Sequence, residues 1–151
     1  MKNIITSGRR KQSIARAVLS EGTGKVTINN INLKVYSMEL SRLKIMEPLM
    51  LASDVASKVD IAIVVRGGGF INQADAARLA VARALVEYNG KLKELFLDYD
   101  RQLLVADIRN KEVSKPNHHG QARASTQTSY RWSIFKFIKF IIYRCLIWSF
   151  Q

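Results

Sequence analysis

The sequence predicts a single α/β layer sandwich with a mixed sheet. Segments in which apolar and polar residues alternate, as they do in half-buried strands, lie on both sides of a segment with helical spacing. A second, longer helical pattern follows three glycines at residues 67–69. The predicted order of elements is β-β-β-α-β-α-α-β. The chain has 151 residues, of which 48% are hydrophobic, so it is long enough for one core.

Three strands are predicted near the start of the chain. Residues 13–19 and 25–29 read as strands, and the glycines within residues 21–24 favour a turn between them. Two asparagines at residues 29–30 mark a second turn. A short third strand is expected at residues 31–35.

The middle of the chain is predicted to form a helix and then a central strand. Residues 38–52 have helical spacing, and we expect Pro48 to break or kink this helix. Residues 59–66 are apolar on both faces and are therefore predicted to form a central strand of a two-layer sandwich.

The strongest helical pattern follows the three glycines and continues to Tyr88. Asn72 is the candidate N-cap, Asp75 is expected in the first turn, and Gly90 marks the end. A shorter helix is predicted at residues 92–99 and a last short strand at residues 103–105.

The periodic pattern ends at residue 109. Residues 109–131 are mostly polar or turn-prone and cannot bury enough apolar surface to offset the entropy of ordering them. We therefore expect an extended basic C-terminal tail that becomes ordered on a partner.

The charge of the chain is divided unevenly along its length. The formal net charge is +12, and residues 1–34 contain seven basic side chains but one acidic side chain. Residues 35–112 contain eleven of each, whereas residues 113–131 and 132–151 each contain three basic and no acidic side chains. Basic ends around a neutral middle indicate a polyanionic partner, nucleic acid before a membrane surface.

Two segments are candidates for contacts with phosphate groups. Arg9, Arg10, Lys11 and Arg16 surround the first predicted strand, where they can neutralise phosphates. The glycines at residues 67–69 lie between a strand and a helix, but neither a P-loop nor a dinucleotide fingerprint is present. A tight turn or an RNA backbone contact is favoured there over a nucleotide site.

The sequence contains no catalytic constellation and no metal motif. His118 and His119 are adjacent in the tail, and no Asp, Glu or Cys accompanies them there. Asp98 and Asp100 are read as a solvated helix end. No apolar stretch follows residues 1–3, so we expect no secretory signal, and the lone Cys145 fits a reducing compartment.

Five segments carry a resemblance to one protein family. They are residues 8–17, 43–49, 66–78, 99–101 and the Ser-Tyr-Arg sequence at 129–131. In this order they resemble the motifs of ribosomal protein nine of the small subunit, in its archaeal type. The resemblance covers residues 4 to 131.

The resemblance implies a fold, a location and a set of contacts. It implies a mixed four-stranded sheet, as in the second domain of ribosomal protein five, and a place in the small-subunit head of the cytoplasmic ribosome. The partners would be 16S-type rRNA, P-site tRNA and neighbouring proteins, without a cofactor, metal, small-molecule substrate or enzymatic activity. The implied rRNA contacts are Arg9, Arg10, Lys11, Arg16, Arg66, Gly67, Gly68, Gly69, Lys115 and Arg123. The implied contacts to P-site tRNA are Tyr130 and Arg131.

The domain organisation expected from the sequence has three parts. They are a body at residues 1–108, the tail at 109–131 and an atypical apolar-aromatic extension at 132–151. The extension holds seven of the thirteen aromatic residues and no Gly, Pro, Asp or Glu. Its three basic residues argue against a membrane span, so an interfacial helix or an appended segment without selected function remains, the latter being favoured.

Two other functions remain open from the sequence. One is a small phosphate-binding enzyme that uses the turn at residues 67–69. The other is a membrane-surface protein that binds through residues 132–151.

Overall fold

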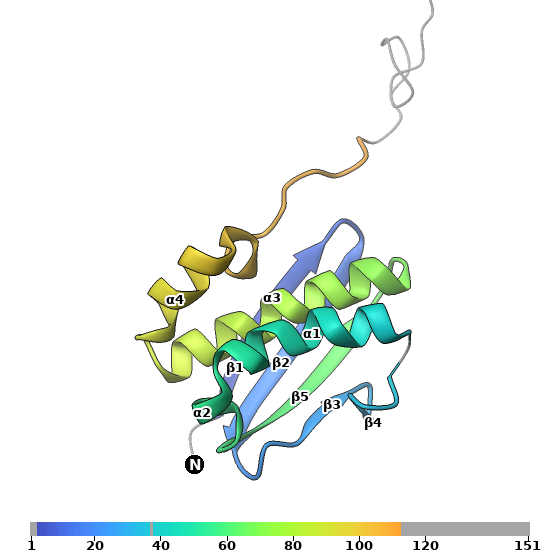
Figure 1. Ribbon diagram of the computed structural model, residues 1–151. Coiled ribbons are helices and arrows are strands. Elements are labelled where there is room, and N and C mark those ends of the chain that lie inside the picture. The colour runs from blue at the N-terminus through green and yellow to red at the C-terminus, as the bar shows by residue number, and fades with distance from the viewer. Residues whose placement is uncertain (1–2, 37, 113–151) are drawn as a thin grey trace, which may run out of the picture. The chain divides into compact units, whose positions relative to one another are not determined.

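The computed structural model describes residues 3–36 and 38–112 and confirms the α/β class. One mixed sheet has helices against one of its faces (Figure 1). The fold belongs to the first of two units of the chain, Met1–Asn110. Most of the predicted tail and the whole extension at 132–151 lie outside the described residues. So do Lys115, His118, His119, Arg123, Tyr130, Arg131 and Cys145.

The sheet has five strands in the order β1-β2-β5-β3-β4. They span Ile4–Arg10 (β1), Ser13–Glu21 (β2), Val26–Ile28 (β3), Ile31–Asn32 (β4) and Val59–Arg66 (β5). Neighbouring strands are antiparallel except β3 and β5, which are parallel. The sheet is therefore mixed, as predicted, but the four strands implied by the resemblance are corrected to five, of which β4 has only two residues.

Edge strand β1 is not among the elements that the sequence predicts. Residues 4–10 contain a glycine and two adjacent arginines and lack a clear alternation, so the hydrophobic pattern does not reveal a strand. Tertiary contacts hold it in place. All seven residues pair with β2, and the Thr6 hydroxyl donates a hydrogen bond to the Ala80 carbonyl at 2.8 Å.

Four helices follow or separate the strands. They are α1 (Glu39–Leu51), α2 (Ser53–Ala56), α3 (Phe70–Tyr88) and α4 (Leu92–Tyr99). Pro48, which the sequence predicts to break or kink the helix, does not break α1, because the helix continues past it to Leu51. Pro48 lies in the last turn, where its buried ring packs in the core and its carbonyl accepts a hydrogen bond from the Ala52 N–H.

Helix α3 begins earlier than predicted. Gly67 and Gly68 have φ angles of 74° and 68°, a left-handed conformation that turns the chain immediately after β5. Gly69 becomes the N-cap in place of Asn72, and its carbonyl accepts the N–H of Gln73 at 2.9 Å. Asp75 consequently lies beyond the first turn, and the helix ends at Tyr88, before Gly90.

The predicted last strand at residues 103–105 is also wrong. Arg101–Leu103 form a single 3₁₀ turn, η1, which follows α4 directly. The Asp100 carboxylate accepts the Gln102 N–H at 2.8 Å and so starts the turn. Leu103 is fully buried against the core, which satisfies its apolar side chain without a strand partner.

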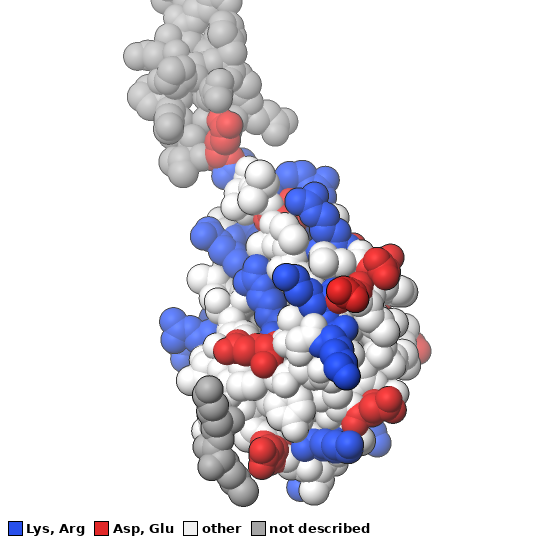
Figure 2. Space-filling view, turned by 90° about the vertical axis from the view of Figure 1, so that its left-hand side faces the viewer, with Lys and Arg blue, Asp and Glu red and all other residues white. Residues whose placement is uncertain are grey.

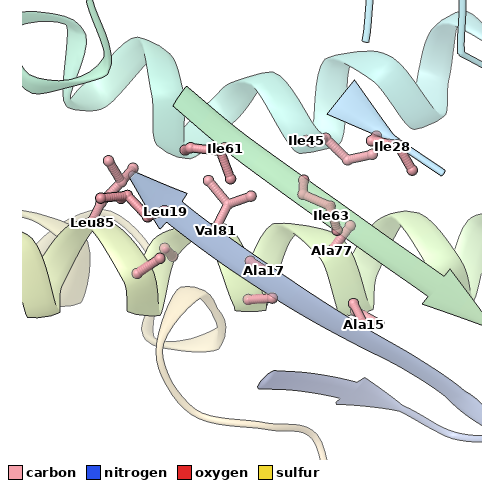
Figure 3. Close-up of a cluster of buried hydrophobic side chains, with 14 of the residues drawn as sticks. Ala15, Ala17, Leu19, Ile28, Ile45, Ile61, Ile63, Ala77, Val81 and Leu85 are labelled. Carbon is pink, nitrogen blue, oxygen red and sulfur yellow. The ribbon is translucent and has the colours of Figure 1, made fainter. Parts of the chain in front are cut away.

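The core lies between α1, α3 and the inner face of the sheet. Isoleucines from α1, β3 and β5 meet Val81 and Leu85 of α3 (Figure 3). Small side chains line the contact between β2 and α3, where Ala15 and Ala17 of the strand face a helix that buries Ala77. These small residues allow the helix to approach the sheet closely.

The outer face of β5 is exposed, although the strand has apolar residues on both faces. Val59, Ile61, Ile63 and Val65 point into the core. The central position of β5 in the sheet is confirmed, but Val64 on its other face is exposed, and the helices pack against the inner face only. The sheet therefore presents an open face that contains apolar side chains.

The close approach of β1 to α3 predicts a strong effect of Gly8→Ala. A Cβ atom at Gly8 would lie 2.2 Å from the Ala76 carbonyl oxygen and 2.8 Å from the Ala80 nitrogen, both in the backbone. We expect the variant to lower the free energy of unfolding by about 1–3 kcal/mol, as overpacking does, measured by urea denaturation of the full chain. Gly90→Ala is the control, because nothing lies within 4 Å of the added Cβ. Equal effects of the two substitutions would contradict the packing argument.

Candidate nucleic-acid interface

The open face of the sheet carries three arginines among apolar side chains. The registers of β1, β2 and β5 align residues in rows across the three strands, and residues directly opposite one another share a face. We call the nine outward residues of three consecutive rows the open-face patch. The rows are Ile5, Val18 and Ala62, then Ser7, Arg16 and Val64, then Arg9, Ile14 and Arg66. The patch contains no acidic residue.

The nearest acidic residue on this face of β5 lies outside the patch and is engaged in other contacts. Asp60 lies one row beyond Ala62, opposite Ser20. Its carboxylate accepts the backbone N–H groups of Lys25 and Thr23, each at 2.8 Å, and these bonds hold the pKa of Asp60 below its usual range. The carboxylate is therefore used to fix the loop before β3, and the three arginines of the patch keep their charge uncompensated within it.

The glycine turn and the β1–β2 hairpin form one end of this face. The Ser13 hydroxyl, which is fully buried, donates to the Gly67 carbonyl at 2.9 Å. A Cβ on Gly67 would lie 2.7 Å from the Gln12 carbonyl oxygen, so the two turns are in direct contact. The packing places Lys11, which is exposed in the hairpin turn, beside the exposed glycines at residues 67–69.

The N-terminal end of α3 opens to solvent at the same place. Nothing lies within 4 Å of a Cβ built on Gly69, and Phe70 is exposed. The first turn of a helix has free N–H groups that favour anions. This end of the sheet therefore combines helix N–H groups with the cations of Arg9, Lys11 and Arg66.

Arg10 lies on the other side of the strand from Arg9 and takes part in an ion-pair cluster. Its guanidinium pairs with Asp107 and lies 3.7 Å from the Asp75 carboxylate, and only 21% of its side chain is exposed. Lys44 pairs with Asp75 at 2.7 Å. The Arg78 guanidinium forms ion pairs with Glu47 at 2.7 Å and with Asp100 at 2.8 Å.

The ion-pair cluster ties residues 107–109 to the rest of the body. Hydrogen bonds from the Arg109 side chain and backbone N–H, together with the Arg10 guanidinium, hold the pKa of Asp107 well below its usual range. A cavity of about 230 Å³ lies among these groups, and its charged lining is largely paired internally. We interpret the cluster as structural.

Comparison with known proteins identifies the family. Residues 8–131 match the family model of ribosomal protein S9/S16. The chain is 50% identical over 130 residues to small ribosomal subunit protein uS9 of Thermoplasma acidophilum, which covers 85% of this chain and all of the relative. It is 46% identical over 133 residues to the uS9 protein of Desulfurococcus amylolyticus, covering 87% of this chain and 94% of the relative. It is 47% identical over 133 residues to that of Methanothrix thermoacetophila, covering 87% and 100%.

The chain belongs to the ribosomal protein S9 family. The archaeal type inferred from the sequence motifs is confirmed by these relatives. S9-family proteins are structural and not enzymes, so the phosphate-binding enzyme considered from the sequence is not supported. The family match ends at residue 131, and residues 132–151 lie beyond it.

The structure brings most of the predicted contact residues of this S9-family chain together. Arg9, Lys11, Arg16, Arg66 and the glycine turn are exposed at one end and on the open face of the sheet. Arg10 is separate from them, because consecutive residues of a strand point to opposite faces.

Sequence reasoning missed two features of this region. The first is the apolar component of the patch, although the period-two pattern of β2 and β5 could have shown that Ile14, Val18 and Val64 share a face with the arginines. The second is Arg83 of α3, whose guanidinium donates to the Ser7 carbonyl at 2.8 Å and to the Leu104 carbonyl at 3.1 Å. No local sequence pattern predicts a contact between residues so far apart.

Residues 3–36 and 38–112 contain neither a metal-binding cluster nor a membrane-spanning helix. No three His, Cys, Asp or Glu side chains gather there in a way that could hold a metal ion. None of the helices in the same part of the chain is long and apolar enough to cross a membrane.

The ion-pair cluster predicts that Arg78→Met destabilises the body. The substitution keeps much of the volume but leaves Glu47 and Asp100 without their shared cation, and the Arg78 side chain is only 15% exposed. We expect the free energy of unfolding to fall by about 1.5–3 kcal/mol, the range for hydrogen bonds to charged groups, in urea denaturation of the full chain. Arg101→Met is the control, because this side chain is exposed and we expect a change within about 0.5 kcal/mol. A loss of similar size in both variants would show that the cluster does not stabilise the fold.

Proposed function

We propose that this chain is a structural protein of the small ribosomal subunit that binds 16S-type rRNA through the open-face patch and the adjoining hairpin. Membership of the S9 family supports the place in the small subunit, since its relatives are small-subunit proteins. The observation that carries the rRNA contact is the patch itself, with three arginines and no acid among nine outward residues. Figure 2 shows one side of the body, on which Lys and Arg form an interrupted band with acidic side chains beside it.

The patch binds RNA by placing cations at fixed separations on a rigid surface. Arg9 and Arg66 lie in one row with Ile14 between them. Their backbones are separated by two strand spacings, or about 10 Å. Guanidinium groups neutralise phosphates and fix the register of the RNA, while the exposed apolar side chains contact sugars and unstacked bases. This function requires no general base, nucleophile or metal ion.

The glycine turn supplies a second kind of contact in the proposed interface. Residues 67–69 are exposed and carry no side chain, so an RNA backbone can come close to their peptide groups. The open N-terminal turn of α3 adds N–H donors for a phosphate. Arg66 lies directly before this turn, which places its charge and the N–H donors at the same end of the sheet.

The tail at residues 109–131 extends the proposed interface beyond the body at residues 1–108. We propose that Lys115 and Arg123 contact rRNA and that Tyr130 and Arg131 contact the P-site tRNA. The family match runs through residue 131, which supports a functional end of the tail at Arg131. We propose that the extension at 132–151 is an appended segment outside this function.

The salt dependence of RNA binding tests the patch. Replacement of Arg9, Arg16 and Arg66 by Gln removes three cations from one face. We expect weaker binding to an rRNA fragment of the subunit head and a salt slope lower by about one unit per lost phosphate contact, measured by filter binding of the full chain over a range of KCl concentrations.

The control for this experiment removes the same charge elsewhere. Lys91, Lys93 and Arg101 are exposed on α4 and η1, in the helical layer, and their replacement by Gln also lowers the net charge by three. We expect a much smaller change in slope. If the two triple variants behave alike, binding depends on net charge and the patch is not the interface.

Loss of the Arg131 side chain tests the proposed role of the tail. We expect Arg131→Ala to weaken retention of P-site tRNA on reconstituted small subunits while assembly is little affected, since one phosphate contact is removed and the body is unchanged. Toeprinting or filter retention measures tRNA binding, and sedimentation measures assembly. The intact mass of the protein in salt-washed subunits shows whether the incorporated form ends at residue 131 or 151. Failure of assembly would show that the role of the tail is misassigned.

A further inference from the structure

A second surface of the body, away from the open-face patch, is an apolar groove. It lies between α1 and the β3–β4 pair (Figure 1) and has a volume of about 500 Å³. Strands β3 and β4 form one edge of the sheet. Its lining combines apolar residues with a short polar rim. The lining includes Lys25, Val26, Leu33, Lys34, Met46 and Met50.

The side of α1 that faces away from the core exposes several large apolar side chains near this groove. The helix turns Ile45 and Pro48 into the core, yet Leu40, Leu43 and Met50 are exposed, and Met50 is 67% exposed. A helix that is apolar around most of its circumference is normally buried. Val35, just before the helix, is 76% exposed, so the apolar surface continues beside the groove.

The loop that forms one wall of the groove is held in a defined shape. The Leu33 N–H donates to the Val26 carbonyl at 3.0 Å, and the Lys34 N–H donates to the Asn32 side chain at 3.0 Å. The Arg42 guanidinium of α1 donates to the Lys34 carbonyl. The wall is thus built by backbone contacts and does not depend on an occupant.

The charges at the groove have one sign. Lys25 and Lys34 are the charged residues of its lining, and both are exposed. Neither forms an ion pair within the described residues, although the Lys25 charge also acts on Asp60, which lies outside the lining. Two cations beside an apolar floor complement a segment that has apolar side chains next to carboxylates. Among the described residues, the groove lining contains no arginine and no part of the N-terminal turn of α3, which are the phosphate donors of the proposed RNA interface, so we assign the groove to a protein segment. The chain's own residues 132–151 have three basic and no acidic side chains and do not match the lysines.

We propose that this groove docks a segment of another protein in which apolar side chains are flanked by Asp or Glu. The proposal rests on the proposed function, because the partner is a neighbouring protein of the small-subunit head. It assigns different partners to two surfaces: RNA to the open-face patch, and an acidic-apolar protein segment to the groove. Adaptable Met46 and Met50 side chains suit the contact with such a segment.

Photocrosslinking in reconstituted small subunits tests the assignment. The photoreactive amino acid benzoylphenylalanine is placed at Met50 in one full-length variant and at Ile14, within the open-face patch, in another. We expect the first to crosslink to a ribosomal protein and the second to rRNA. Mass spectrometry of the crosslinked peptide is expected to show an apolar segment with Asp or Glu within a few residues of the attachment point.

A charge reversal in the same background tests the role of the lysines. Lys25→Glu with Lys34→Glu should lower the yield of the Met50 crosslink by roughly tenfold, because the new carboxylates repel those of the partner. Crosslinking from Ile14 to rRNA should not change. Lys91→Glu with Lys93→Glu makes the same change in net charge on α4 and should leave both crosslinks as they were.

The outcomes separate this proposal from the proposed function. The docking proposal is overturned if Met50 crosslinks to rRNA, to residues 132–151 of its own chain, to a segment without acidic residues, or to nothing in subunits that contain the variant. It is also overturned if the charge reversal leaves the yield unchanged. If the chain does not enter the subunit, the proposed function fails and the docking proposal fails with it. If only the Ile14 crosslink to rRNA is missing, the patch is misassigned and the groove assignment stands.

Discussion

The close contact between α3 and the inner face of the sheet determines where the proposed binding residues lie. Six alanines of the helix are buried, and on the strand side there is no room for a Cβ at Gly8 beside the helix backbone. A larger side chain at this contact would push the helix away from β1 and β2. The start of α3 would then move relative to the hairpin, and the Ser13–Gly67 hydrogen bond that joins the two turns would be lost. The position of the glycine turn beside Arg9 and Lys11 is therefore a consequence of packing.

The same contact leaves the two faces of the sheet with different chemistry. The inner side chains of β5 are buried, whereas the outer face shows Val64, Ile14 and Ile5, the last of which is 70% exposed. Exposed branched apolar side chains gain nothing from folding alone, because they stay in contact with water. Contiguous exposed apolar surface usually marks a site that a partner covers. The arginines between these side chains restrict the partner of this face to one that carries negative charge.

The sequence predicts best the elements whose formation depends on their own residues. Strands β2 and β5 and helices α3 and α4 are recognisable from their periods, and the grouping of Arg16, Arg66 and the glycine turn follows once β2 and β5 form one sheet. Strand β1 is missed because pairing with β2 and contact with α3 stabilise a segment that has no pattern of its own. The N-cap is misplaced because Gly67 and Gly68 complete the turn before Asn72 is reached. The 3₁₀ turn at Leu103 likewise depends on a tertiary contact, since the core buries that side chain.

Pairing of charges decides which basic side chains remain available to the proposed RNA partner. Residues 35–112 have equal numbers of acidic and basic side chains, and several of them are joined in the cluster around Asp75, Arg78 and Asp107. Arg10 lies within the basic segment near the N-terminus, but its charge is used in that cluster. A variant that removes Arg10 together with its neighbours would therefore disturb the fold as well as the proposed interface. A count of basic residues along the sequence therefore overestimates the number of cations at the proposed interface. The alternation of side chains along β1 places Arg10 in the ion-pair cluster, whereas Arg9 faces outward with Arg16 and Arg66.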